Sequence, residues 1–390
     1  MKELRYFCTA GKGMEQFLVQ EVISKLSACD VEHIPGKVFF TTSAGLERLR
    51  GLKSAERLFL LLKKLPPLPA PWDSGKMTRV IQEKIIGELG DWQQGLSAWL
   101  SLQQAAKESR LGPAASRRSR KRKRDEETGK EEEEEEGDGS SPAKKQDLQV
   151  LDSAADVISS SKQPLVSFRV CCRCSGILAR KFSPQELGRI IGMAIHKRLG
   201  WKADLREPDL EFDVSFQVNV HLSDAHCILG FPVFRLPLAH RPYIRTTGLR
   251  STTAWAMASL AAIKQDGCFV LDPMCGVGTI LIEAAKEWQN AFFLGIDINE
   301  SQLKKARENI QFSDLTSRIE LMKASVTEIP LPAASVDAVI CDIPFGRKFG
   351  CKTDVRIMLP AIVKEMERVL RVGGTLVLLL SPQLSAFLGK

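Results

Sequence analysis

The chain has 390 residues, of which 44% are apolar and 26% are charged, and its formal net charge is +8. This composition is typical of a folded protein with two or three domains, and the positive charge is compatible with a polyanionic partner without requiring one. No apolar run approaches the ~18 residues of a membrane span, and residues 1–13 have no signal-peptide core, so we expect a reducing compartment.

Residues 1–103 are predicted to form a compact α/β domain. Residues 5–8 and 37–41 indicate strands, and apolar residues at helical spacing in 14–26 indicate a helix. We also expect a helix over 46–62, which becomes strongly apolar towards its end. Two strands and two helices in this order fit a split βαβ arrangement, as in ferredoxin-like domains.

Residues 104–147 differ sharply in composition from the rest of the chain. Seven of the eight residues at 117–124 are basic, and ten acidic residues follow within 125–138. Because this segment cannot bury enough apolar surface to become ordered, we predict a disordered charged linker. The basic run also has the composition of a nuclear import signal, so we expect a nuclear protein, with the cytoplasm as the alternative.

Residues 148–236 return to α/β character. Residues 165–174 indicate a strand, and Ser183-Pro-Gln-Glu186 is a capping box that begins a helix ending at Gly200. Between Arg169 and Arg206 there are nine basic and only two acidic residues, which indicates either a solvated face or a phosphate-binding surface.

Three cysteines in the same strand, Cys171, Cys172 and Cys174, include a Cys-x-x-Cys spacing. A zinc site needs four ligands, and no second Cys/His pair lies near enough in the sequence to complete one. We therefore expect structural thiols and no metal site.

Residues 251–390 show strand–helix alternation after a connector at 237–250. Strands are expected at 268–272, 292–297, 318–322, 336–341 and 375–380. Helices are expected at 252–264, 279–288, 300–310 and 354–370. This order predicts a doubly wound, mostly parallel sheet, which binds ligands at the carboxyl ends of its strands.

A glycine turn, Asp272-Pro-Met-Cys-Gly-Val-Gly-Thr279, follows the first of these strands. Gly276 and Gly278 let the backbone approach a ligand, and the next helix offers free N–H groups. Asp297 ends the second strand, where a carboxylate can accept both ribose hydroxyls. A dinucleotide would also suit this pair, but its third glycine is absent and Asp272 would repel a pyrophosphate. The pattern favours S-adenosylmethionine, which carries an ammonium and a sulfonium.

A second functional segment, Asp342-Ile-Pro-Phe345, ends the fourth strand. It suits an amino group on a planar ring, because Asp342 and the Ile343 carbonyl can accept the two N–H bonds. That interaction pushes the nitrogen lone pair out of conjugation and stabilises the positive charge that grows during transfer. Pro344 would fix the turn, and Phe345 would stack on the ring.

The residues expected to bind the cofactor come from the glycine turn, the ends of the second and third strands, and the helix start at 252. They are Asp272, Pro273, Cys275, Gly276, Gly278, Thr279, Asp297, Ile298, Ser325, Val326, Thr252 and Thr253. The two threonines are expected to meet the carboxylate of the cofactor.

These motifs resemble those of the THUMP-domain RNA guanosine methyltransferases. Leu249-Arg-Ser-Thr-Thr-Ala-Trp-Ala-Met257 is similar to the segment that joins the RNA-binding and catalytic halves of that family. The resemblance covers nearly the whole chain apart from the charged linker. It implies a ferredoxin-like domain at 1–103, a THUMP domain at 148–236 and a Rossmann-type methyltransferase domain at 251–390.

The resemblance also implies methylation of the exocyclic N2 amine of guanosine in a small structured RNA, either a tRNA or a small nuclear RNA. Family members resembling this chain act with a small zinc-binding activator subunit that covers an apolar sheet edge. The basic residues expected to contact RNA are Arg173, Arg180, Lys181, Lys197 and Arg198.

Three departures from the family pattern leave alternatives open. Ile343 replaces the usual second proline, and Ser325 stands where an aspartate often binds the adenine. The chain also stops ten residues after the fifth strand, where the family adds two more, so we expect a C-terminally short domain. The alternative is therefore a catalytically weak or inactive RNA-binding or regulatory protein. A protein or DNA amine methyltransferase would share the reaction motif but has no use for the THUMP-like half.

Overall fold

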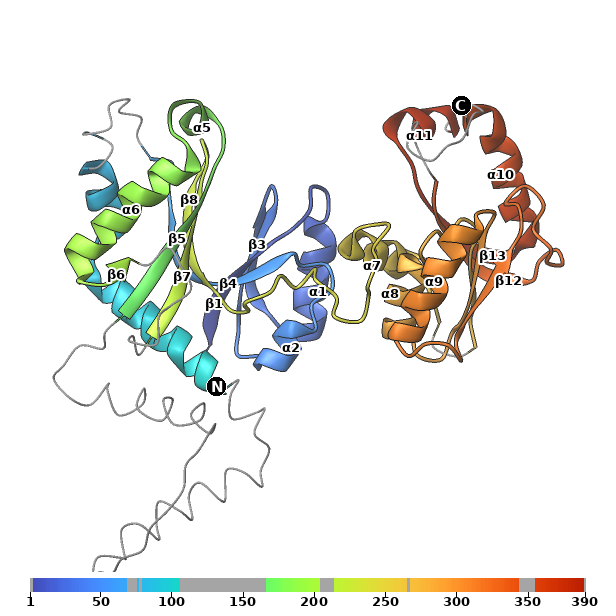
Figure 1. The fold of residues 1–390 in the computed structure, drawn as a ribbon, viewed down its shortest axis with the longest axis horizontal. Helices are drawn as coiled ribbons and strands as arrows, with labels where there is room; N and C mark the ends of the chain where they lie inside the picture. Colours follow the sequence, from blue (N-terminus) through green and yellow to red (C-terminus); the bar gives the residue numbers. More distant parts are fainter. Residues whose placement is uncertain are drawn as a thin grey trace, which may run out of the picture. The chain divides into compact units, whose positions relative to one another are not determined.

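The structure, a computed structural model, divides by its contacts into two units. It describes residues 3–68, 76, 79–105, 166–203, 214–264, 267–343 and 355–388. The first unit comprises Met1–Glu3, Cys8–Leu58 and Leu236–Lys390, and the second comprises Leu4–Phe7 and Phe59–Arg235 (Figure 1). Nearly all of the predicted linker, from residue 106 onwards, lies outside the described residues. No helix in the described ranges is both long and apolar enough to cross a membrane.

The second unit is built around neighbouring strands in the order β4-β8-β7-β5-β6. These strands are β4 (Arg57–Leu65), β5 (Val166–Cys174), β6 (Lys202–Ala203), β7 (Val214–Leu222) and β8 (Cys227–Pro232). Its helical elements include η1 (Ile81–Ile86), α5 (Ile177–Lys181) and α6 (Pro184–Leu199).

The predicted start and end of α6 are confirmed. The Ser183 side chain accepts a hydrogen bond from the Glu186 N–H at 3.1 Å, which satisfies an otherwise free donor of the first turn. Gly200 ends the helix in the left-handed conformation, with φ +72°.

The predicted helix over residues 46–62 is wrong in its second half. The helix α2 covers only Leu46–Arg50, and the apolar run lies in strand β4. Strand β4 pairs antiparallel with β8, with Leu60 opposite Phe231. A short, continuous apolar run has no period that distinguishes a buried strand from a buried helix.

The N-terminal part of the first unit contains α1 (Glu15–Leu26), β2 (Cys29–Ile34), β3 (Lys37–Thr42) and α2. Strands β2 and β3 form an antiparallel pair, and β1 (Leu4–Thr9) neighbours β3. The boundary between the two units falls within β1.

The remainder of the first unit contains a five-stranded sheet in the order β11-β10-β9-β12-β13, in which each pair of neighbouring strands is parallel. The strands are β9 (Phe269–Asp272), β10 (Phe292–Asp297), β11 (Ile319–Lys323), β12 (Val336–Asp342) and β13 (Leu370–Leu379). The helices are α7 (Ser251–Leu260), α8 (Thr279–Glu287), α9 (Glu300–Phe312), α10 (Val355–Val369) and α11 (Pro382–Leu388).

Alternate residues of each central strand enter two different hydrophobic cores, which lie on the two faces of the sheet. Val270 and Ala338 belong to the core that contains residues of α7, α8 and α9. Leu271 and Val339 belong to the core that contains residues of α10 and α11. Helices thus cover both faces, and the prediction of a doubly wound parallel sheet is confirmed.

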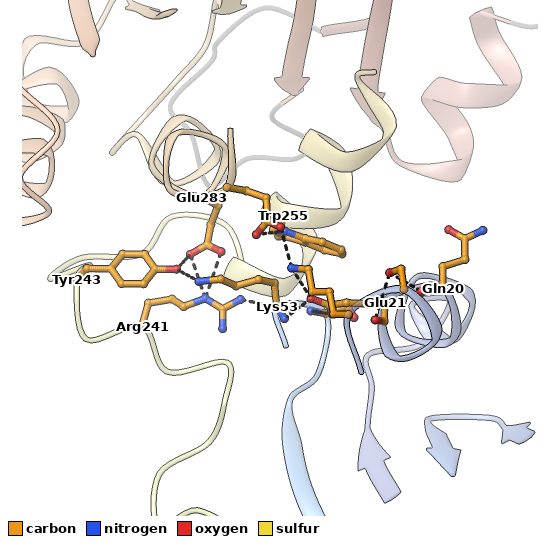
Figure 2. Close-up of polar contacts among 11 residues, drawn as sticks. Gln20, Glu21, Lys53, Arg241, Tyr243, Trp255 and Glu283 are labelled. Carbon is orange, nitrogen blue, oxygen red and sulfur yellow. Dashed lines mark hydrogen bonds and ion pairs between the residues drawn. The ribbon is translucent and has the colours of Figure 1, made fainter. Parts of the chain in front are cut away.

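Buried polar contacts tie the segment Cys8–Leu58 to helix α8 within the first unit (Figure 2). Glu21 of α1 accepts a hydrogen bond from the Lys53 N–H at 2.7 Å. The Arg241 guanidinium donates to the Lys53 carbonyl at 2.7 Å and to Glu283 of α8 at 3.0 and 3.2 Å. Both members of the Arg241–Glu283 ion pair are buried.

Candidate active site

Three carboxylates stand at the carboxyl ends of three strands of the parallel sheet. Asp272 ends β9, Asp297 ends β10 and Asp342 ends β12, and β9 lies between the other two strands. The chain leaves β9 for β10 on one side and reaches β12 only later on the other, so strand order reverses at β9. Doubly wound sheets bind ligands at such a position.

Asp272 is the most deeply buried of the three, with 1% of its surface exposed. Burial raises the pKa of its carboxyl well above the ordinary value, the Met274 N–H bond at 3.2 Å opposes this rise, and the charges of Asp342 and Asp297 add to it. Asp297 and Asp342 therefore both lie near enough to Asp272 to disfavour its ionised form. A positively charged ligand would relieve this repulsion.

The glycine turn after β9 is held by the end of β10. The Gly276 N–H donates to Asp297 at 2.9 Å, and the Cys275 N–H donates to the Ile296 carbonyl at 2.9 Å. Gly276 and Gly278 have φ values of +53° and +80°, which residues other than glycine rarely adopt. Asp297 also accepts the Asn299 N–H at 2.8 Å through its other oxygen.

Asp342 has an unsatisfied oxygen. Among the described residues that are not exposed, Asp342 Oδ1 and Ser251 Oγ are the buried side-chain oxygens without a hydrogen-bond partner. Burial raises the pKa of the Asp342 carboxyl above its ordinary value. The neighbouring Ile343 buries its side chain and donates its N–H to the Leu379 carbonyl at 3.2 Å. Pro344 and Phe345, the other predicted catalytic residues, lie outside the described residues.

The remaining predicted cofactor residues fall into two groups. Pro273, Cys275 and Thr279 are buried, and Cys275 points into the core beside α8, so it can meet a ligand only through its backbone. Ile298, in contrast, is exposed at the end of β10, and Ser325 and Val326 are half-buried after β11.

Of the two threonines of α7 that were expected to meet a cofactor carboxylate, Thr252 has a different partner. Thr252 is fully buried, and its hydroxyl donates to Glu56 at 3.1 Å. Thr253 is half-buried. The unpartnered hydroxyl belongs instead to Ser251, the first residue of the same helix, which sequence reasoning did not single out.

The five predicted RNA contacts are exposed in the second unit, and in the described part of the chain none of them has an acidic partner. Arg173 lies on β5, and Arg180 and Lys181 end α5, just before α6 begins. Lys197 and Arg198 lie in the last turn of α6, so the two pairs stand at opposite ends of that helix, roughly 20 Å apart at 1.5 Å per residue. The five residues therefore do not form a single cluster.

The hydrogen-bond acceptors at the sheet edge fit S-adenosylmethionine. Each oxygen of Asp297 accepts one backbone N–H, and a carboxylate has about four acceptor positions, so it keeps capacity for ribose hydroxyls. A Cβ added to Gly276 would meet no atom within 4 Å, so space remains beside the turn. Asp272 and Asp342 are two further carboxyl groups at the same edge of the sheet, and a cationic ligand would favour their ionised forms.

A doubly wound parallel sheet with this glycine turn and these strand-end carboxylates defines the class of Rossmann-type methyltransferases. Residues 239–387 match the family model UPF0020, described as RMKL-like, methyltransferase domain. TrmN from Thermus thermophilus shares the fold with a TM-score of 0.62 and 22% identity, over 98% of this chain and 91% of that one.

Curated relatives give the family. U6 snRNA (guanine-N(2))-methyltransferase THUMPD2 of Bos taurus is 46% identical, over 97% of this chain and 78% of the relative. tRNA (guanine(6)-N(2))-methyltransferase THUMP3 of Bos taurus is 28% identical, over 97% and 81%. The chain belongs to this family of RNA guanine-N2-methyltransferases, which confirms the resemblance, and S-adenosylmethionine is its cofactor.

Proposed function

We propose that this enzyme methylates the N2 amine of a guanosine in U6 small nuclear RNA. The relatives named for that RNA are 43–46% identical to this chain, whereas the relatives named THUMP3, which act on tRNA, are 28% identical. The observation that carries the chemistry is Asp342 Oδ1, a buried acceptor without a partner at the end of β12. A guanosine amine offers two N–H donors, one for this oxygen and one for the Ile343 carbonyl.

Each of the strand-end residues has a separate role in this proposal. The bound cofactor supplies an activated methyl group on a sulfonium. Asp297 holds the ribose hydroxyls, and Asp272 faces positive charge. Asp342 and the Ile343 carbonyl would accept the two amine N–H bonds, so that the nitrogen lone pair would leave conjugation with the ring and become available to the methyl group. After the methyl group has moved from sulfur to nitrogen, the nitrogen would release one proton, which Asp342 or solvent can accept. Because the Oδ1 atom of Asp342 is already buried, that atom loses little hydration when the base arrives.

We further propose a nuclear protein that acts with a small zinc-binding activator subunit. The basic run at 117–124 and the relatives named for U6 snRNA support a nuclear location. The resemblance to family members that act with such a subunit supports the second part of this proposal. Deleting 117–124 from a tagged chain should move the protein to the cytoplasm, and unchanged nuclear signal would refute the import role.

The activity test uses the full chain with labelled S-adenosylmethionine, with and without the activator subunit. U6 small nuclear RNA should gain N2-methylguanosine, detected by mass spectrometry of nucleosides, and a tRNA pool should gain less. Asp342→Asn keeps the shape but removes the charge, and we expect a loss of about 10²–10³ in kcat. The same transfer rate in Asp342→Asn would refute this assignment, and RNA binding without any transfer would favour a regulatory protein.

A further inference from the structure

Asn309, on the face of α9 that packs against the glycine turn, is 1% exposed and uses its whole hydrogen-bonding capacity. Its side-chain oxygen accepts the N–H groups of Arg245 and Thr246 at 3.1 and 3.0 Å. Its side-chain nitrogen donates to the Thr246 carbonyl at 2.7 Å and to the Val277 carbonyl at 2.9 Å. An amide has two donors and two acceptor lone pairs, so no capacity is left over.

The partners of Asn309 belong to two segments far apart in the sequence. Val277 stands between the two glycines of the cofactor turn, and Arg245 and Thr246 lie in the connector before α7. Two further observations show that the connector and α9 lie close to the glycine turn. The Gly248 N–H donates to the Thr279 hydroxyl at 3.2 Å, and a Cβ added to Gly278 would lie 3.6 Å from Ala306 of α9.

The cofactor turn needs such an outside support. Glycine loses more conformational freedom on ordering than any other residue, and this turn holds two glycines in the left-handed region. The turn is tied to the end of β10 through Cys275 and Gly276, whereas Val277 is tied to α9 through Asn309. Without the Asn309 bond, the part of the turn that leads into α8 would lose one of its anchors.

We infer that Asn309 is a positioning residue for the cofactor: it fixes the Val277 carbonyl, and so keeps the Gly276–Thr279 backbone in the conformation that S-adenosylmethionine binds. The inference rests on the methyltransferase assignment but not on the identity of the RNA. Asparagine is required because aspartate keeps the two acceptor bonds and loses both donor bonds. Aspartate would also face the Thr246 and Val277 carbonyls with an unprotonated oxygen.

The test compares Asn309→Asp with Leu303→Ala in the full chain. Leu303 lies on the same helix and is fully buried in the core to which α7, α8 and α9 contribute. Its aliphatic side chain cannot hydrogen-bond to the turn, so Leu303→Ala serves as a control for general destabilisation. The cofactor dissociation constant is measured by calorimetry without RNA, and KM for S-adenosylmethionine and kcat are measured with RNA. The hydrogen-exchange rates of the turn amides at 275–279 are measured in each variant.

Asn309→Asp is expected to raise the cofactor Kd and KM about tenfold, since a buried carbonyl is left unpaired, while kcat at saturating cofactor changes less than about threefold. The amides of the turn should exchange faster. Leu303→Ala should lower Tm at least as much and leave the cofactor Kd within about twofold. Wild-type cofactor affinity in Asn309→Asp, or an equal loss in Leu303→Ala, would overturn the inference. Because Kd is measured without RNA, a wrong RNA substrate would not affect this result.

Discussion

The buried ion pair between Arg241 and Glu283 offers a quantitative test of how the first unit is held together. Their side chains are 4% and 0% exposed, and Glu283 also accepts the Tyr243 hydroxyl at 2.9 Å. Glu283→Gln keeps the shape of the side chain and removes its charge, so the Arg241 guanidinium stays buried without a counter-charge. Removing one member of a buried pair costs about 3–5 kcal/mol. For a unit of this size, Tm should fall by roughly 6–20 °C.

The double variant gives the sharper measurement. Arg241→Met removes the charge of Arg241 but also leaves the Leu238 and Lys53 carbonyls without their donors, so it is destabilising in its own right. When Glu283→Gln is added, neither charge of the Arg241–Glu283 ion pair remains. The double variant should therefore cost at least ~2 kcal/mol less than the sum of the two single variants.

Because chains with two units commonly unfold in more than one step, the assay must report on α8 locally. Hydrogen exchange of peptides covering α1 and α8 provides this free energy. The reasoning is refuted by additivity within about 0.5 kcal/mol, or by a Glu283→Gln effect below about 1 kcal/mol, because either result means that water compensates the charges.

Two further predictions concern the sheet edge. Asp272→Asn should raise the Tm of the cofactor-free protein at pH 7–8. The pKa of the Asp272 carboxyl is raised in the folded state, so this carboxyl makes the folded protein less stable as the pH rises towards that pKa, and asparagine removes the effect. The gain should vanish below about pH 4, while cofactor affinity at pH 7 should fall, and a gain that is independent of pH would contradict this account. Gly295→Ala should destabilise by about 1–3 kcal/mol in urea unfolding followed by α8 exchange, because its Cβ would lie 2.7–2.9 Å from Leu281, Leu321 and Cys275. If adding Leu321→Val restores part of the lost stability, the steric cause is supported. If Gly295→Ala leaves the free energy of unfolding unchanged, the steric cause is contradicted.

The strand-end carboxylates illustrate what the sequence can predict. Asp272, Asp297 and Asp342 each follow an apolar run, and the rules for parallel sheets place such residues at one edge. Their roles stay predictions, but their juxtaposition followed from strand order alone. The capping box at Ser183 was equally readable, because both partners lie within one turn.

Other features depended on partners distant in the chain. The apolar run in β4 became a strand because β8 lies beside it, and nothing within residues 46–62 records that neighbour. Strand β2 was missed because its sequence, Cys-Asp-Val-Glu-His-Ile, has little apolar content and depends on pairing with β3. Asn309 appears in the sequence as one more polar residue on an amphipathic helix, and only the fold places Val277 and Thr246 beside it.

Helix α8 explains why the division by contacts departs from a linear division of the chain. Its first residue, Thr279, accepts the Gly248 N–H, and Glu283, one turn later, is bound to Arg241, which is itself bound to Lys53. Glu287 in the last turn pairs with Lys25 of α1 at 2.8 Å. One short helix thus follows the cofactor turn at one end and anchors the segment Cys8–Leu58 along its length. Loosening that segment would therefore remove support from the helix that begins directly after the glycine turn.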